Sequence, residues 1–295
     1  MSAEHNPNLQ LLETDHLHHI QLVKDKDGIK DHDGNLIDFS DVKFVLTGGS
    51  SNRLTKAAHF TNERIYNNKY TVNNLCTSDR FVLYKVGQVI CVNHGMGIPS
   101  MSICFNEIFK LLSYAGCTDV ALIRIGTSGG VGVPPGTVIV SKGALDGLLR
   151  HVHQMESLGQ VRLLPALFDQ EFIHELIEFT DSRRYPFGVE TGSTLGTNDF
   201  YEGQGRMDGF ACSYTDEDRA QFLKLLNELG VRNIEMEAPG FAALTYRARI
   251  KGAIVCTTIL NRLEGDQVTA TEAELKDFED RPIRVVLDFI KHKLS

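Results

Sequence analysis

Long apolar runs are missing from this sequence of 295 residues, and so are the short signatures of a nucleotide-binding phosphate loop. No stretch approaches the ~18 apolar residues that a membrane span needs. The N-terminal stretch is polar and acidic, without the apolar core of a signal peptide. These absences predict a protein with no membrane partner.

Positive charge is also in short supply. The chain carries 30 Lys and Arg against 38 Asp and Glu, a net charge of −8, and its pI is about 5.8. Binding to nucleic acid or to an anionic membrane depends on a basic surface. The sequence therefore predicts no nucleic-acid partner.

Cysteine is present, but not in pairs. The six cysteines form no C-x-x-C motif and mostly lie among apolar residues, which is typical of buried free thiols in a reducing cytoplasm. Histidines cluster at His16, His18 and His19, but no H-x-x-x-H pair with a third ligand accompanies them. We expect no metal and a cytoplasmic location.

Regular elements alternate along the chain. Runs rich in β-branched residues predict strands at 42–46, 89–92, 120–125, 137–140 and 254–260, while residues 99–115 show a helical period. A capping box at Thr215 predicts a helix with Phe222, Leu225, Leu226 and Leu229 on its buried face, and a last helix is expected at 282–293. Residues 23–38 are predicted to form a charged, turn-rich segment at the surface. The alternation indicates an α/β protein, which we take as a single domain over residues 1–295.

Two glycine-rich stretches suggest an anion site. The stretch "VALIRIGTSGGVGVPPGTVIV" (120–140) holds Arg124, Gly126 and Thr127, yet spells neither Gly-Lys-Ser/Thr nor GxGxxG. The stretch "VLTGGSSNRL" ends a strand at Gly49 and places Arg53 just beyond it. Ligands of open α/β sheets bind beyond the carboxyl ends of strands, and arginines with bare backbone amides suit phosphate. Ordinary turns and surface charges are the alternative for each stretch alone.

A third region combines an amide, a guanidinium and two acids. Gln204 and Arg206 lie in a Gly-rich loop and offer hydrogen bonds that match a planar ring with carbonyls and an N–H. Glu235 and Glu237 flank Met236 where a helix begins. One acid can bond a ligand hydroxyl while the other orders the turn; acids that complement the helix dipole are the alternative.

Together these stretches resemble a known family. The motifs "GGSSNR", "TSDRFVLYKVG", "NHGMGIPS", "IRIGTSGG", "DFYEGQGR", "NIEME" and "ILNRLEGDQ" occur in the order found in the animal-type uridine phosphorylases, a branch of the nucleoside phosphorylase family. The resemblance runs from about Asp15 to the C-terminus. It implies a three-layer αβα sandwich with a central mixed sheet, and residues 1–40 as an N-terminal extension at a subunit interface.

The resemblance also implies a role for each matching residue. Phosphate would be bound by Gly49, Arg53, Arg124 and Thr127, with Arg80 reaching the phosphate of the neighbouring subunit. The base and nucleoside would be bound by Ser128, Gly129, Phe200, Gln204, Arg206, Ile259 and Leu260, and the ribose by Met236 and Glu237, with His19 lent across the interface of a homodimer.

The reaction implied is the phosphorolysis of uridine to uracil and ribose 1-phosphate, which makes the chain a pentosyltransferase of pyrimidine salvage. Phosphate is a co-substrate and no cofactor is needed. The alternatives are a related hydrolase, which would use water, and a catalytically impaired nucleoside-binding paralogue. The latter is motivated by one departure, "EMEAPG", in which Ala238-Pro239-Gly240 replaces the small residue and unbroken helix that usually follow this motif.

Overall fold

A computed structural model describes residues 6, 9 and 12–295, so the first part of the predicted N-terminal extension lies outside the described residues. The chain divides into two compact units. Unit 1 comprises Met1–Ile123, Arg247–Lys251 and Ile290–Ser295, and unit 2 comprises Arg124–Tyr246 and Gly252–Phe289. The single domain over 1–295 stays a prediction, and each unit is described in turn.

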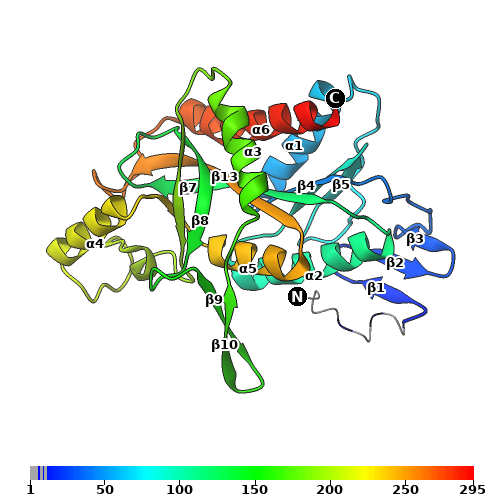
Figure 1. The fold of residues 1–295 in the computed structure, drawn as a ribbon, viewed down its shortest axis with the longest axis horizontal. Coiled ribbons are helices and arrows are strands. Elements are labelled where there is room, and N and C mark those ends of the chain that lie inside the picture. Colours follow the sequence, from blue (N-terminus) through cyan, green and yellow to red (C-terminus); the bar gives the residue numbers. More distant parts are fainter. Residues whose placement is uncertain (1–5, 7–8, 10–11) are drawn as a thin grey trace. The chain divides into compact units, whose positions relative to one another are not determined.

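In the part of unit 1 that the structure describes, two groups of strands occur with two complete helices and the last turn of a third, residues 290–294 (Figure 1). A small antiparallel sheet is formed by β1 (Asp15–Leu17), β2 (Leu22–Asp25) and β3 (Gly28–Lys30). The stretch 23–38 is therefore not only turns, because Ile29 is buried and gives β3 a reason to form. The second group has β4 (Phe44–Gly48) parallel to β6 (Val89–Asn93), and β5 (Leu83–Val86) antiparallel to β6. Helices α1 (Ser51–Arg64) and α2 (Ile98–Tyr114) complete it.

Unit 2 is built on five strands that close on themselves. Their order is β12-β11-β8-β13-β7, and β12 also pairs with β7. Parallel pairs (β11 with β8 and with β12) occur beside antiparallel ones (β13 with β8), so the sheet is mixed as predicted. The bounds are β7 (Ala121–Gly130), β8 (Val138–Leu145), β11 (Val189–Gly196), β12 (Val231–Glu235) and β13 (Lys251–Asn261).

The remaining elements of unit 2 surround or extend these strands. Strands β9 (Val152–Ser157) and β10 (Gln160–Pro165) form a hairpin that extends away from the rest of the unit (Figure 1). The helices are α3 (Gln170–Asp181), the short 3₁₀ helix η2 (Glu202–Gln204), α4 (Asp216–Glu228), α5 (Ala238–Ala248) and α6 (Glu272–Leu294). The last residues of α5 and α6, 247–248 and 290–294, belong to unit 1. The predicted α/β class is confirmed.

The predicted elements mostly form, with two corrections. All five predicted strands and the helix at 99–115 are present to within a few residues, and β7 and β8 run longer than predicted. Helix α6 starts ten residues before Pro282, which lies inside it. Thr271 and Glu274 bond each other's backbone N–H there, at 2.7 and 3.3 Å, and so begin the helix earlier.

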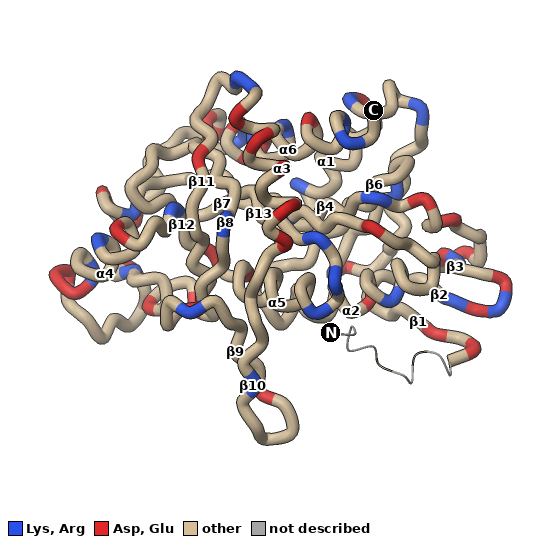
Figure 2. The backbone as a smooth tube through the Cα atoms, in the orientation of Figure 1, with Lys and Arg blue, Asp and Glu red and all other residues tan. Residues whose placement is uncertain are grey.

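Helix α4 begins as predicted, but its buried face is only partly the predicted one, because Leu226 and Phe222 pack against the core while Leu225 and Leu229 do not. Both bonds of the Thr215 capping box form, and three acids fill the first turn, favourably placed at the positive end of the helix dipole (Figure 2). The buried positions, however, are Leu223 and Leu226, whereas Leu225 and Leu229 are 43% and 54% exposed. Apolar residues occur on both faces, so the sequence period alone could not choose between them.

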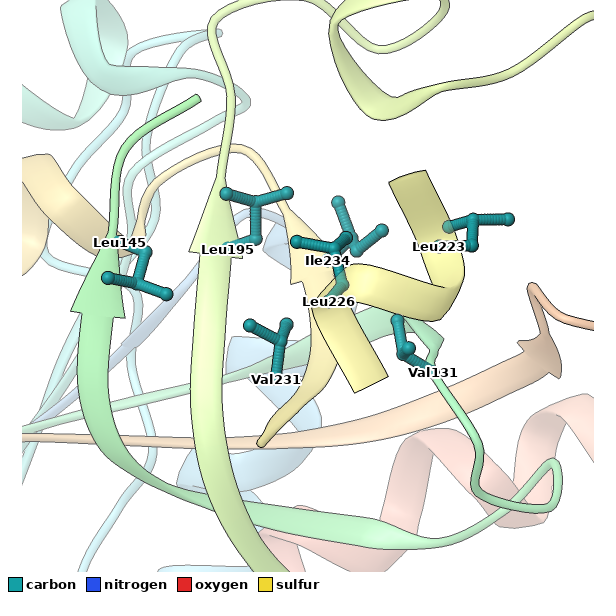
Figure 3. Close-up of a cluster of buried hydrophobic side chains, with 7 residues drawn as sticks. All are labelled: Val131, Leu145, Leu195, Leu223, Leu226, Val231 and Ile234. Atoms are coloured by element: carbon teal, nitrogen blue, oxygen red, sulfur yellow. The ribbon is translucent and has the colours of Figure 1, made fainter. Parts of the chain in front are cut away.

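The strands decide which face of α4 is buried. Leu223 and Leu226 pack into a cluster with residues of β8, β11, β12 and the turn after β7 (Figure 3). Burial of such side chains contributes roughly 1.5–3 kcal/mol each. The members are Val131, Leu145, Leu195, Leu223, Leu226, Val231 and Ile234.

Four of the six cysteines are buried free thiols, Cys117 is half-buried and Cys212 is exposed. Burial raises the pKa of the Cys91 thiol to about 12, so this side chain packs as a small apolar group and is not a nucleophile. Within the described residues, no helix is both long and apolar enough to cross a membrane.

Candidate active site

The glycine-rich stretch after Arg124 is strand, not turn. Strand β7 continues through Gly130, so residues 126–130 do not form a turn, and whether they bind phosphate stays a prediction. A Cβ at Gly126 would lie 3.1 Å from the Sγ of Cys256, and one at Gly130 would lie 2.8 Å from the carbonyl oxygen of Leu260. These glycines are needed because neighbouring strands approach closely, and not for a left-handed turn.

Arg124 projects from β7 into a buried charge cluster. Its Nη2 donates to the Oε2 of Glu235 at 2.8 Å and also to a carboxylate oxygen of Glu237. Its Nη1 lies 3.3 Å from the Sγ of Cys256. All three charged side chains are at most 6% exposed. One guanidinium thus faces two carboxylates in a medium where charge is poorly screened.

Glu235 also begins the next helix. Its side chain accepts hydrogen bonds from the backbone N–H of Glu237 at 3.0 Å and of Ala238 at 2.7 Å. The first N–H groups of a helix lack internal partners, so a carboxylate at this place stabilises the start of α5. Of the two acids, Glu235 is therefore the one that orders the turn.

Pro239 fits this turn without displacing Glu237. It is the second residue of α5, where a missing N–H breaks no hydrogen bond of the helix. Its ring lies over Gly196, where an added Cβ would come within 2.2 Å of the proline Cδ. Glu237 keeps its bond to Arg124. The Ala238-Pro239-Gly240 departure therefore leaves this contact intact.

Burial shifts the ionisation of the cluster. The pKa of Glu235 is raised to about 7, mainly by desolvation; the charge of Arg124 opposes this rise, and the charge of Glu237 adds to it. Burial alone would lower the pKa of Arg124, but the two carboxylates together hold it above its usual value. Arg124 is a permanent cation, and Glu235 is the carboxylate that titrates near neutrality.

The Gln204 loop is joined to the same cluster. Helix η2 ends at Gly205, whose φ of 68° is left-handed and suits glycine. Gln204 is buried, and its Nε2 donates to the carbonyl oxygen of Glu235 at 3.3 Å. A carbonyl can only accept, so this contact orients the amide and leaves the Oε1 of Gln204 as the atom available to a ligand.

Arg206, in the same loop, contacts Asp208 and Phe200. It forms two hydrogen bonds with Asp208, at 2.9 and 2.6 Å, and its guanidinium lies 4.6 Å from the ring centre of Phe200. The bond to Asp208 raises the pKa of Arg206. Phe200 and Arg206, both predicted to contact the base, are thus in contact with each other.

Arg262 supports the loop and was missed by the sequence analysis. It is 1% exposed, and its Nη2 donates to the carbonyl oxygens of Gln204 and Gly205, both at 3.0 Å. Asp266 balances its charge at 2.9 Å. The only signal was an arginine inside the motif "ILNRLEGDQ", at the end of an apolar strand.

Ser128 belongs to a chain of buried hydroxyl and amide groups. Its Oγ donates to the carbonyl oxygen of Thr257 at 3.2 Å and accepts from the Nδ2 of Asn233 at 3.0 Å. Asn233 accepts in turn from Thr194 at 2.7 Å, and Thr194 contacts Ser141 at 2.5 Å. The chain links all five closed strands, so Ser128 is fixed by its partners.

The other predicted residues of unit 2 lie on these strands or directly after one of them. Thr127 and Gly129 are on β7, Met236 lies between the two acids, and Ile259 and Leu260 are on β13. Gly129 packs against Arg262, since a Cβ there would lie 3.2 Å from its Cδ.

Unit 1 holds the other predicted phosphate residues. Gly49 follows β4, and a Cβ there would come within 3.0 Å of the carbonyl oxygen of Gly95. Ser50 caps α1 by accepting from the backbone N–H of Arg53, whose side chain is buried in the first turn. His94 is fully buried, with Nδ1 at 2.7 Å from the Gly95 oxygen and its ring against Phe105.

His19 and Arg80 also belong to unit 1. The Oγ of Ser78 donates to the carbonyl oxygen of His19 at 3.2 Å, which ties His19 to the loop that carries Arg80. Arg80 itself is exposed. The described residues contain no group of three or more His, Cys, Asp or Glu that could hold a metal ion.

The charge cluster predicts how Glu235→Gln changes the pH dependence of stability. An acid with a raised pKa holds its proton more tightly in the folded state, so its ionisation costs stability. That cost is absent below the ordinary pKa of 4.5 and complete above about 7. As the pH rises between these values, the free energy of unfolding of the wild type should fall by up to about 3 kcal/mol relative to that of the variant.

Urea unfolding of both proteins from pH 4.5 to pH 8 measures this difference. Glu228→Gln is the matched control, because Glu228 is 61% exposed beside Lys224, and its difference from wild type should stay constant with pH. Parallel curves for wild type and Glu235→Gln would contradict a raised pKa at Glu235.

Comparison with known proteins places these features in one family. The chain matches the family described as the phosphorylase superfamily over residues 43–291. It is 45% identical to the uridine and thymidine phosphorylase of Caenorhabditis elegans, covering 91% of this chain and 92% of that protein. It is 36% identical to inactive uridine phosphorylase B of Schistosoma mansoni, covering 97% and 95%.

The fold agrees with these sequence relationships. The crystal structure of uridine phosphorylase from Schistosoma mansoni in complex with thymidine matches with a TM-score of 0.90 and 37% identity, covering 98% of this chain and 97% of that one. The predicted nucleoside phosphorylase fold and the predicted resemblance to uridine phosphorylases are both confirmed. The chain belongs to the phosphorylase superfamily and, within it, to the uridine phosphorylase family.

Proposed function

We propose that the chain cleaves uridine with phosphate, giving uracil and ribose 1-phosphate. Family membership supports this pentosyltransferase reaction. The observation that carries it is the double role of Glu235. Its carboxylate bonds Arg124, the proposed phosphate ligand, and its backbone oxygen bonds Gln204, the proposed base ligand. One residue therefore fixes the groups for both substrates.

The charges around Arg124 suit a bound anion that reacts. A phosphate oxygen attacks the anomeric carbon as the bond to the uracil nitrogen breaks, so the ribose becomes positive and the bonding electrons leave with the base. Arg124 holds the attacking anion, and the phosphate charge stabilises the cationic sugar. Glu237, held by Arg124, is placed to accept from a ribose hydroxyl and thereby orient the sugar.

The remaining phosphate and sugar contacts follow the family pattern. Phosphate would also be bound by Gly49, Arg53 and Thr127, and by Arg80 of a second subunit; the nucleoside would contact Ser128, Gly129, Met236, Ile259 and Leu260.

The Gln204 amide gives the base site its selectivity. Its Oε1 is the available atom and can only accept, which matches the N3–H of uracil and opposes the bare N3 of cytosine. Arg206 can only donate, which matches a uracil carbonyl and opposes the cytosine amino group. The hydrogen bonds of Gln204 and of Arg206 therefore both favour uracil over cytosine.

Assembly and location are part of this proposal. We infer a homodimer in which His19 and Arg80 complete the site of the neighbouring subunit. We also infer a cytoplasmic location, which the six free cysteines favour because a reducing compartment keeps thiols unpaired. Phosphate is a co-substrate, and the proposed mechanism requires no cofactor.

The function is tested by following uracil release from uridine in ultraviolet light, with and without phosphate. Phosphate should be required, and Arg124→Ala should lower kcat/KM by at least about 100-fold, because charged hydrogen bonds to the attacking anion are lost. Release without phosphate would indicate a hydrolase. Uridine binding without any release would indicate a nucleoside-binding protein, which one relative's description as inactive makes a relevant outcome.

Base selectivity predicts a specific effect of Arg206→Ala. Wild type should strongly prefer uridine over cytidine, because sites built on such hydrogen bonds can reject mismatched ligands by about 10⁴-fold. The variant should lose uridine turnover and narrow the ratio of the two kcat/KM values. If the ratio is unchanged, Arg206 does not read the base.

Shared sites predict that two inactive variants restore activity together. Arg80→Ala and Arg124→Ala should each be nearly inactive, yet a mixture allowed to exchange subunits should regain about a quarter of the wild-type sites, since half the dimers are hybrids with one intact site each. Mixing Arg124→Ala with Glu237→Ala is the control. Each of these two changes disables the site of the subunit that carries it. Both sites of a hybrid dimer are then inactive, and no recovery is expected. Verified hybrids without recovery would contradict sharing.

A further inference from the structure

A partly buried carboxylate on α2 accepts three hydrogen bonds from His19 and Ile20. Glu107 accepts from the backbone N–H of His19 at 3.0 Å and of Ile20 at 2.9 Å. Its Oε1 lies 2.7 Å from the Nδ1 of the His19 ring. The Glu107 side chain is 12% exposed, whereas that of His19 is 43% exposed. A shielded acid thus holds a histidine whose ring is open on its other side.

This contact decides which ring nitrogen carries hydrogen. An ionised carboxylate can only accept, so Nδ1 must be the donor. In the neutral ring, Nε2 then has a free lone pair. No atom of the described residues bonds Nε2, so it is the atom that a ligand can reach.

Hydrogen bonds also hold the backbone around His19 in place. Its carbonyl oxygen accepts from Ser78 at 3.2 Å and from the Sγ of Cys76 at 3.4 Å, and the ring of Phe81 lies 6.4 Å away, centre to centre. Next to it, the Oε1 of Gln21 accepts from the backbone N–H of Thr77 at 2.6 Å. His19 and the residues that lead to Arg80 therefore form one cross-linked segment.

We propose that Glu107 is a positioning residue, which holds His19 in the Nδ1–H form so that Nε2 can accept a hydrogen bond from a sugar hydroxyl of the nucleoside. This rests on the proposed function, in which His19 serves a nucleoside site. A carboxylate that fixes the tautomer and direction of an acting histidine is an established device of enzyme sites. Glu107 itself touches no substrate.

The exchange Glu107→Gln tests the tautomer directly. The new amide can still accept from the backbone with its oxygen, but its NH₂ can face the ring and donate to Nδ1, which moves the ring hydrogen to Nε2. Two-bond ¹H–¹⁵N correlation spectra distinguish the two forms of His19. Wild type should show Nδ1–H and the variant Nε2–H. Glu178→Gln is the matched control, because His174 and Glu178 form an exposed pair, 71% and 67% exposed, that should not affect His19.

Kinetics then separate positioning from a merely structural role. Glu107→Gln should lower kcat/KM for uridine roughly five- to tenfold, the effect of one ordinary hydrogen bond, with the melting temperature little changed. In a His19→Ala background the same exchange should have no further effect, because only the histidine transmits it. Deoxyuridines that each lack one ribose hydroxyl identify the hydroxyl that His19 binds. Wild type and Glu107→Gln should have equal kcat/KM values for the analogue that lacks this hydroxyl.

Each outcome supports or overturns the proposal. Tautomer reversal together with the non-additive loss of kcat/KM supports it. Nε2–H in wild type, or an undiminished effect of Glu107→Gln in the His19→Ala background, overturns it. If wild type releases no uracil, the proposed function fails while the spectra still test the tautomer. If wild type is active and His19→Ala changes nothing, the proposed role of Glu107 fails and uridine phosphorolysis stands.

Discussion

The buried cation of Arg124 is the constraint on which the junction of β12 and α5 depends. A guanidinium that is 4% exposed needs carboxylates close by, because leaving it unpaired would cost several kcal/mol. Glu235 and Glu237 meet this need from the junction of β12 and α5. The position of that junction, and with it the start of α5, is therefore tied to a charge carried by β7.

The closed ring of strands makes this arrangement possible. Because β12 pairs with both β11 and β7, the end of β12 lies beside the strand that carries Arg124. Close packing of these strands explains the glycines at 126, 129 and 130, since a side chain there would meet a neighbouring strand or Arg262. The glycines that look like a phosphate loop thus serve strand packing.

Both units use the same device of a shielded acid that orients a more exposed or reactive group. In unit 2, Glu235 holds Arg124, the start of α5 and the Gln204 amide. In unit 1, Glu107 holds the ring and backbone of His19. In each case one carboxylate accepts several hydrogen bonds. The groups that donate them are therefore held in one fixed arrangement.

The sequence by itself determined the strands, the α2 helix, the capping box of α4 and the residue types of the site, because these depend on local periodicity and on motif order. Tertiary structure alone decided that residues 126–130 continue a strand, that Leu223 and not Leu225 is buried, and that Arg262 supports the Gln204 loop. It also decided between the two acids, since only the fold brings Arg124, Glu235 and Glu237 within hydrogen-bonding distance. Such contacts join residues up to 113 positions apart, and no local pattern encodes which face or partner such distant segments meet.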